Sequence, residues 1–291
     1  PDFNLGVEER LRAQGIKTVQ FIAPAVWAWR AGRIKAVERA VDHLLAVFPF
    51  EQALFEKAGV RCTYVGHPLA RRIPRHPDAP AARARLRLSA DAPTLAVLPG
   101  SRRAEIEALG PPFTATVDAL LQQDARLQVI VPAADETLGL RLAQMLSGLS
   151  HRARVHLLRG HSHDALEAAD VALVAGGTAT LEAMLFKRPM VIAYKVPRLT
   201  EWLTRRKALI PYFGLPNILA QRFIVPEYLQ KDVTPQMLVP AVLRYFDSDR
   251  EVNGLREQFA ALHETLLRDT PALFAQAVSE LARGARRHSH H

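Results

Sequence analysis

The glycine pair Gly176-Gly177 is the feature of this sequence best suited to hold a charged ligand. It follows an apolar run at residues 171–174, and a helical pattern begins at Thr178. Glycine lets the backbone approach a ligand closely, and the first N–H groups of a helix attract anions. We therefore predict that Gly176, Gly177, Thr178 and Ala179 bind phosphate. Glu182, one turn further along the helix, is predicted to accept hydrogen bonds from ribose hydroxyls. The alternative is a tight strand-to-helix turn, with Thr178 as its N-cap and Glu182 as a surface charge.

A second loop of similar type contains Gly100, Ser101 and Arg102. It follows the apolar run at residues 94–98, and an arginine fork there matches the oxygens of a diphosphate. Neither the P-loop pattern nor the G-x-G-x-x-G pattern occurs in the chain. Taken alone, the loop fits a β-turn with a solvated arginine equally well. Loops that follow parallel strands lie at one edge of a sheet, where ligands bind, so the two loops support each other.

Four further polar residues stand at loop positions and are weaker candidates. Asn217 stands between apolar residues, and it either reaches into a cleft, where it would orient phosphate or sugar, or forms a turn after proline. Asp2, Glu51 and His67 could each act as an acid or base. A helix cap or a turn is the more common role for each of them.

The composition excludes several classes of protein. The apolar fraction is 49%, and no window approaches the roughly 18 consecutive apolar residues of a membrane-spanning helix. Cys62 is the single cysteine, and no carboxylate pair or histidine cluster has metal-ligand spacing. Intramolecular disulfides are therefore excluded, and we expect neither a metal nor a cofactor.

The net charge of +9 implies affinity for nucleic acid, a phosphorylated substrate or an acidic membrane surface. Because no aromatic RNA-binding strand and no zinc-finger spacing accompany the basic residues, we expect no nucleic-acid partner. A solvated basic surface is the simplest interpretation, and attraction to an anionic membrane comes next. One segment could form an amphipathic helix that contacts the membrane, or else an ordinary helix that packs on the sheet. Its apolar residues are Leu199, Trp202, Leu203 and Ile210, and its basic residues are Arg205, Arg206 and Lys207.

Strand-like and helix-like patterns alternate along most of the chain, which predicts an α/β fold with doubly wound parallel sheets. The strands are expected at residues 17–23, 43–48, 61–65, 94–98, 127–131, 154–158, 171–174 and 189–194. The intervening helices are expected at 49–58, 111–123, 136–146, 163–169 and 178–186. The last third is expected to be helical, at 235–246, 251–267 and 271–283. Four prolines at residues 66–80 break the periodicity and indicate a linker.

A series of motifs that spans the chain resembles the lipid-A-disaccharide synthases, inverting glycosyltransferases of the two-domain GT-B architecture. The matching stretches are Pro1-Asp2-Phe3-Asn4, Ala25-Val26-Trp27-Ala28-Trp29-Arg30, Phe48-Pro49-Phe50-Glu51, Gly66-His67-Pro68-Leu69, Leu98-Pro99-Gly100-Ser101-Arg102, the run from Gly176 to Glu182, and Leu215-Pro216-Asn217-Ile218-Leu219. Their order and spacing make the resemblance more specific than any single motif.

The resemblance implies a reaction of lipid A and lipopolysaccharide biosynthesis. A 2,3-diacylglucosamine unit moves from UDP-2,3-diacylglucosamine to the 6-hydroxyl of 2,3-diacylglucosamine 1-phosphate, and UDP leaves. Because both substrates are membrane lipids, the enzyme is expected to be peripheral on the cytoplasmic face of the bacterial inner membrane. Arg102 and the N–H groups from Gly177 to Ala179 would stabilise departing UDP, and Asp2 is a candidate general base. By analogy, a homodimer would exchange C-terminal helices.

The expected domains are an incomplete acceptor-side domain at residues 1–70, a linker at 71–92, a UDP-sugar-binding domain at 93–245 and C-terminal helices at 246–291 that pack on the first domain. In the family, an acidic residue, a glycine-rich loop and an apolar patch precede the first motif. If the protein itself begins at Pro1, it is expected to bind UDP without turnover. The alternatives are another UDP-sugar enzyme (a 2-epimerase or a peptidoglycan glycosyltransferase), a non-catalytic UDP-binding remnant, or a basic nucleic-acid-binding protein.

Overall fold

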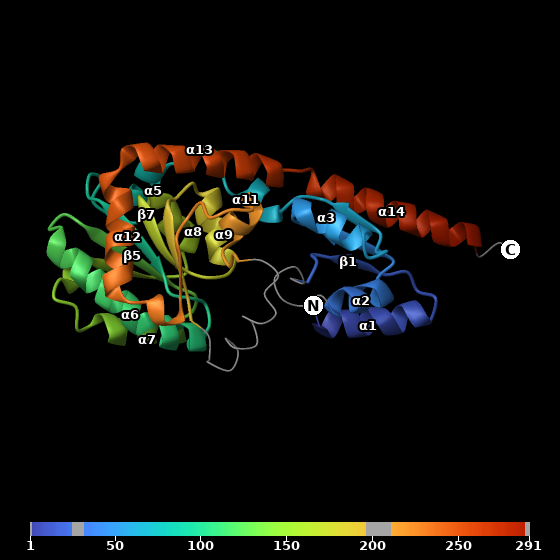
Figure 1. The fold of residues 1–291 in the computed structure, drawn as a ribbon, viewed down its shortest axis with the longest axis horizontal. Helices are drawn as coiled ribbons and strands as arrows, with labels where there is room; N and C mark the ends of the chain where they lie inside the picture. The colour runs from blue at the N-terminus through green and yellow to red at the C-terminus, as the bar shows by residue number, and fades with distance from the viewer. Residues whose placement is uncertain (1, 25–31, 196–210, 289–291) are drawn as a thin grey trace. The chain divides into compact units, whose positions relative to one another are not determined.

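The structure, a computed structural model, describes residues 2–24, 32–195 and 211–288 (Figure 1). The chain divides into two compact units. The smaller unit contains the residues up to Arg72 together with those from His263 onward, and the larger unit contains residues 73–195 and 212–262. Each unit has its own parallel sheet, as the alternation of patterns predicts.

A six-stranded parallel sheet forms the centre of the larger unit. Its strands are β4 (Thr94–Leu98), β5 (Gln128–Ala133), β6 (Val155–Arg159), β7 (Val171–Ala175), β8 (Met190–Tyr194) and β9 (Glu227–Leu229). Their order is β6-β5-β4-β7-β8-β9, and all neighbours are parallel. Every residue of β4, β5 and β7 is buried, which explains their continuous apolar sequences. The direction of strand order reverses between β4 and β7, the topological switch point of a doubly wound sheet.

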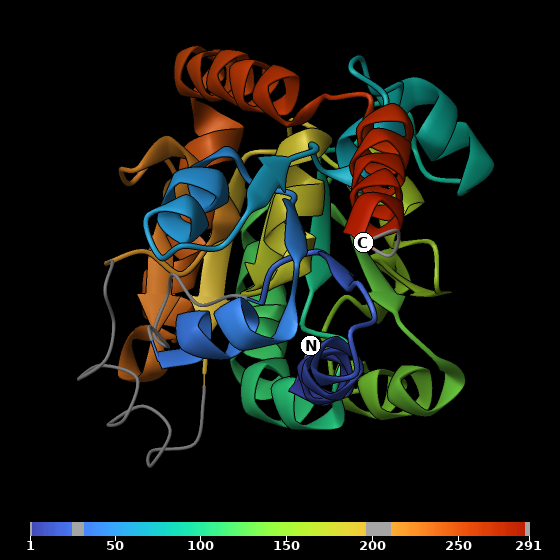
Figure 2. The same cartoon turned by 90° about the vertical axis from the view of Figure 1, so that its right-hand side faces the viewer.

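Helices cover both faces of this sheet (Figures 1 and 2). One group is α6 (Arg103–Gln123), α7 (Glu136–Leu146) and α12 (Pro235–Asp247), in which α6 contacts the other two. The second group is α5 (Ala79–Arg85), α8 (Ser162–Ala168) and α9 (Thr178–Leu185), in which α8 contacts the other two. The remaining elements of the unit are α11 (Leu215–Ala220), most of α13 (Asp249–Leu266) and short 3-10 helices at Arg152–Arg154 and Gln230–Asp232.

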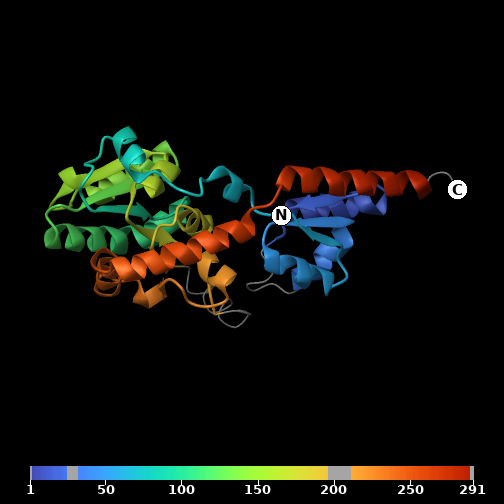
Figure 3. The ribbon, with the colours of Figure 1, turned by 90° about the horizontal axis from the view of Figure 1, so that it is seen from above.

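The smaller unit contains a three-stranded parallel sheet. Its strands, in the order β1-β2-β3, are β1 (Val19–Phe21), β2 (His43–Ala46) and β3 (Cys62–Tyr64). Its helices are α1 (Asp2–Ala13), α2 (Gly32–Ala40), α3 (Pro49–Glu56), α4 (Pro68–Arg72) and α14 (Thr270–His288). Helix α14 lies along this unit (Figure 3) and packs against β2, where Ala277 joins Leu45 and Val65 in an apolar cluster.

The start of α6 and the expected linker differ from the sequence prediction, and the short elements α4, α11 and β9 were not expected. Helix α6 begins at Arg103, so the predicted start at Pro111 is wrong: proline is common in a first helical turn, but here Pro111 and Pro112 lie inside a longer helix. The expected linker at 71–92 contains α5. The side chain of Asp78 caps this helix by accepting the N–H of Ala81, and Ala82 is fully buried in a cluster with residues of β5 and α8.

The Ala25–Arg30 motif and the predicted amphipathic segment from Leu199 to Ile210 lie outside the described residues. Within the part of the chain that is described, no helix is both long and apolar enough to cross a membrane.

Candidate functional site

The two predicted loops leave the larger sheet side by side at the switch point. Strands β4 and β7 are neighbours, with Leu98 opposite Val174 in the ladder. The loop at 99–102 and the glycine pair Gly176-Gly177 therefore both begin at the carboxyl edge of the sheet. This edge is where doubly wound folds bind their ligands.

The glycine pair has a geometry that requires glycine at both positions. Gly177 is the N-cap of α9 and has a φ of 131°, which residues with a Cβ rarely adopt. A Cβ on Gly176 would lie 2.8 Å from Cδ2 of Tyr194. Thr178 is therefore not the N-cap, and the alternative prediction for it is wrong. No side chain caps α9, and both Gly177 and Thr178 are exposed, so the first N–H groups of the helix face an accessible position.

The loop after β4 is ordered by a carboxylate that sequence analysis did not identify. Oε2 of Glu105 accepts the N–H groups of Ser101 (2.9 Å) and Arg102 (3.3 Å), and its Oε1 pairs with Nη1 of Arg102 at 2.6 Å. Gly100 has a φ of 123°, and a Cβ there would lie 2.5 Å from Cβ of Glu105. The side chain of Arg102 is 80% exposed. This role of Glu105 was not predicted, because the predicted helix began eight residues after the observed start.

Tyr194, at the end of β8, lies against the glycine pair and is influenced by the charges of the first loop. Its ring lies against Gly176 and stacks on Phe213 with the ring centroids 6.3 Å apart. Burial raises the pKa of Tyr194, the charge of Glu105 raises it further, and Arg102 opposes both effects. The sequence carries no signal for this role, because a strand that is buried on both faces has no alternation to show where its last side chain points.

Glu182 lies one turn into α9, on the same helix that begins at the glycine pair. Its side chain is 19% exposed, and Oε1 lies 3.8 Å from Nε2 of His163. Burial raises the pKa of Glu182, and His163 acts in the opposite direction. The His163 ring in turn meets the edge of Phe186, with the centroids 5.4 Å apart. The carboxylate is thus held in place while part of it stays accessible.

The side chain of Asn217 is bonded within the fold on both sides of its amide. It is fully buried, its amide donates to the carbonyl of Val225 (2.9 Å) and to Oε1 of Glu227 (2.7 Å), and its oxygen accepts the N–H groups of Ile224 and Val225. These four bonds use the full capacity of a primary amide. Asn217 therefore holds the chain before β9 in place and has no group left for phosphate or sugar in this arrangement.

Glu227 extends this network to the segment that precedes α11. Its carboxylate accepts the N–H groups of Phe213 (2.9 Å) and Gly214 (2.8 Å). Burial raises the pKa of Glu227, and these bonds, with the one from Asn217, counteract the rise. Leu215, which follows Gly214, donates its N–H to Oγ1 of Thr180 in α9. The network therefore connects the start of α11 to the glycine-pair helix.

In the smaller unit, the candidate acids and bases are largely engaged. Glu51 is buried and accepts the N–H groups of Val47 and Phe48, which is a cap role. Nδ1 of His67 accepts the N–H of Leu69, and burial lowers the pKa of His67 to about 4. Neutral His67 therefore carries its proton on Nε2 and can donate there. Asp2 is the first residue of α1, and its side chain is outside the description. Among the described residues, we find no group of three or more His, Cys, Asp or Glu side chains that could hold a metal ion.

The chain matches the family described as lipid-A-disaccharide synthetase over residues 1–278. It is 48% identical over 283 residues to the lipid-A-disaccharide synthase of Cupriavidus pinatubonensis, covering 97% of this chain and 70% of the relative. It is 49% identical over 282 residues to that of Verminephrobacter eiseniae, covering 96% and 72%. The chain belongs to the lipid-A-disaccharide synthase family. It is therefore a hexosyltransferase that forms the lipid A disaccharide.

Solved structures support the fold independently of this family. Anabaena HepE, solved in complex with UDP and glucose, aligns with a TM-score of 0.57 and 16% identity over 94% of this chain and 75% of its own. WaaG, a glycosyltransferase involved in lipopolysaccharide biosynthesis, aligns with a TM-score of 0.53 and 14% identity over 94% and 80%. The predicted two-domain GT-B fold is thus confirmed.

Proposed function

We propose that the switch-point loops of this lipid-A-disaccharide synthase bind the diphosphate of UDP-2,3-diacylglucosamine. The observation that carries the proposal is the convergence of two glycine-containing loops, the uncapped start of α9 and Arg102 on one sheet edge. N–H groups at a helix start and an arginine fork are typical donors to phosphate oxygens. HepE, which shares the fold, was solved with UDP bound. Gly100, Ser101, Gly176, Gly177, Thr178 and Ala179 would surround the diphosphate.

The proposed step moves a sugar with inversion. The 6-hydroxyl oxygen of 2,3-diacylglucosamine 1-phosphate attacks the anomeric carbon, the bond from that carbon to the diphosphate oxygen breaks, and its electron pair leaves with UDP. Negative charge grows on UDP, so donors fixed at the start of α9 and at Arg102 stabilise the transition state more than the ground state. The hydroxyl proton passes to a general base, for which Asp2 is the candidate. Glu182 would accept hydrogen bonds from the ribose.

The substrates imply the setting of the enzyme. Both are proposed to be acylated glucosamine lipids, so we place the protein peripherally on an anionic membrane, at the cytoplasmic face of the inner membrane. The net charge of +9 favours such a surface. We also propose that the reaction needs no metal ion and that the protein works as a homodimer.

A product assay tests the proposal. UDP-2,3-diacylglucosamine and 2,3-diacylglucosamine 1-phosphate are incubated with the full-length protein in detergent, with and without EDTA, and products are separated by mass. We expect UDP and a β-1,6-linked disaccharide in equal amounts, with no effect of EDTA. UDP bound by the protein without any disaccharide would instead indicate a binding protein, and loss of activity in EDTA would contradict the metal-free mechanism.

A further inference from the structure

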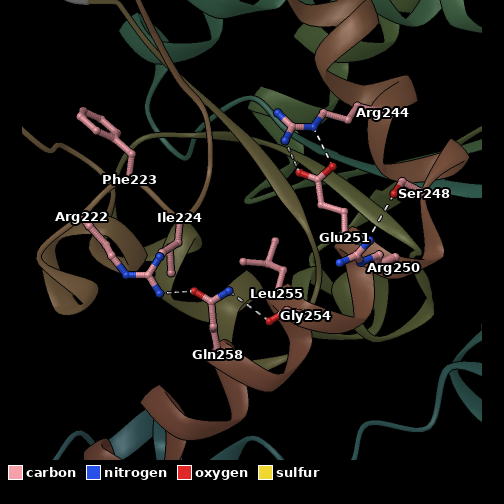
Figure 4. A pocket seen from close by; sticks show the side chains of 10 residues that line it. All are labelled: Arg222, Phe223, Ile224, Arg244, Ser248, Arg250, Glu251, Gly254, Leu255 and Gln258. Carbon is pink, nitrogen blue, oxygen red and sulfur yellow. Dashed lines mark hydrogen bonds and ion pairs between the residues drawn. The ribbon is translucent and has the colours of Figure 1, made fainter.

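A pocket on the larger unit is distinct from the proposed diphosphate site. It has a volume of about 430 Å³. Its walls come from the segment at 222–224, from the end of α12 and from the first turns of α13 (Figure 4). Because all strands are parallel and residues 222–226 precede β9, the pocket lies at the edge where strands begin. The switch-point loops lie at the opposite edge, where β4 and β7 end.

The polar lining of the pocket has an excess of positive charge. Arg222, Arg244 and Arg250 line it together with one carboxylate, that of Glu251. The charge of Arg244 is balanced by Glu251, because Nε and Nη2 of Arg244 bind the two carboxylate oxygens of Glu251 at 2.7 and 2.6 Å. Figure 4 shows this pair on the side of the pocket that α12 and α13 form.

The charges of the other two arginines, Arg222 and Arg250, are not balanced by a carboxylate in the pocket. Arg222 donates to the neutral amide of Gln258 at 2.6 Å, which orients its guanidinium without neutralising it. Neither Arg222 nor Arg250 forms an ion pair with a carboxylate of the described residues. Asp247 ends α12 and Asp249 begins α13, and neither of them lines the pocket. Two uncompensated guanidinium groups from separate segments therefore face one cavity.

The floor of the pocket is apolar and open. Leu255 is buried and Ile224 is half-buried at this floor. Gly254 leaves space, since a Cβ there would meet no atom within 4 Å. The cavity can thus hold a group larger than a water molecule between the two arginines.

We propose that this pocket binds a phosphate group through Arg222 and Arg250. A phosphate monoester or diester fits best, because arginine forks match phosphate oxygens and because the apolar floor accommodates the carbon chain of an ester. The ester is either a small soluble molecule or the headgroup of an anionic lipid. The pocket is independent of the UDP site, so UDP and phosphate bind together.

Calorimetric titration with inorganic phosphate, in the absence and in the presence of saturating UDP, tests the proposal. We expect saturable phosphate binding that Arg222→Ala and Arg250→Ala each weaken about tenfold, as loss of one charge-assisted hydrogen bond does. Gly254→Leu should abolish binding by filling the cavity. Two controls, Gly254→Ala and Arg126→Ala on a different surface, should leave it unchanged. Binding that UDP displaces, or that all these variants leave intact, would overturn the proposal, as would no binding by the wild-type protein.

The source of the phosphate is distinguished by two further probes. Glycerol 3-phosphate represents a soluble ester, and vesicles of phosphatidylglycerol represent a lipid headgroup. Binding of glycerol 3-phosphate that Gly254→Leu abolishes assigns the pocket to a soluble ester. Vesicle binding that Arg250→Ala weakens, with no binding of glycerol 3-phosphate, assigns it to a lipid headgroup. If Gly254→Leu and Arg250→Ala change neither interaction, the pocket is not a phosphate site.

Discussion

At the scale of residues, the proposed diphosphate site depends on backbone geometry as much as on charge. Gly100 and Gly177 both have φ values that favour glycine, and each stands two residues beyond the end of a strand of the switch point. Glu105 and Arg102 then fix the first loop by an ion pair and two backbone hydrogen bonds. The glycines and Arg102 could be predicted from residue type and position. Glu105 could not, because its role depends on where the helix begins.

Gly177→Ala is expected to reduce both stability and UDP affinity. A Cβ in this backbone conformation costs about 1–3 kcal/mol, and relief of the strain would turn the first N–H groups of α9 away from the phosphate. Urea unfolding and UDP titration measure the two effects. Gly160→Ala is a matched control, since Gly160 also has a positive φ but follows the edge strand β6. The control should lose stability alone, and equal losses of affinity in both variants would contradict the assignment.

His67 is expected to make folding stability depend on pH between about 4 and 6.5. Its folded pKa of about 4 lies below the ordinary value of 6.5, so in this range the unfolded chain binds more protons than the folded one. The stabilisation is therefore fully present above pH 6.5 and falls by up to about 3 kcal/mol as the pH drops to 4. His67→Gln lacks the titrating group. Urea unfolding should give a flatter pH profile for the variant, and identical profiles would rule out a neutral buried His67.

At the scale of elements, the alternation of strands and helices predicts the larger sheet well, because its strands are buried and continuously apolar. The prediction fails where a short element lacks such a pattern. Strand β9 has three half-buried residues, and α5 lies among prolines that resemble a linker. The role of Asn217 also belongs to this scale. Its four bonds go to three residues of the segment 224–227, whose approach to Asn217 is set by the fold, and no local pattern reveals them.

Asn217→Asp should destabilise the protein by about 2–4 kcal/mol. A carboxylate can still accept the N–H groups of Ile224 and Val225, but it cannot donate to the Val225 carbonyl, and it lies next to the Glu227 carboxylate. Urea unfolding measures the loss, and UDP affinity of the folded fraction should change less than threefold. If stability were unchanged while UDP affinity fell strongly, Asn217 would contact the ligand after all.

At the scale of the whole molecule, the excess of basic residues over acidic ones is the property that bears on substrate access. With a net charge of +9, the protein should bind vesicles that contain phosphatidylglycerol, because long-range attraction to anionic headgroups is favourable at low salt. Flotation should show binding that decreases as salt rises from about 0.05 to 0.5 M, since screening shortens the range of the attraction. Neutral phosphatidylcholine vesicles are the control, and equal binding to both would contradict an electrostatic origin.

The central claim is that the switch-point loops bind the diphosphate of UDP. Calorimetric titration of UDP into the wild-type protein, Arg102→Ala and Arg103→Ala tests it most directly. The two arginines are adjacent, both are more than three-quarters exposed, and each pairs with a glutamate, so they differ mainly in their position relative to the loop. We expect Arg102→Ala to weaken UDP binding about 10- to 100-fold and Arg103→Ala to have little effect. Equal affinity in all three proteins, or the loss appearing only in Arg103→Ala, would contradict the account.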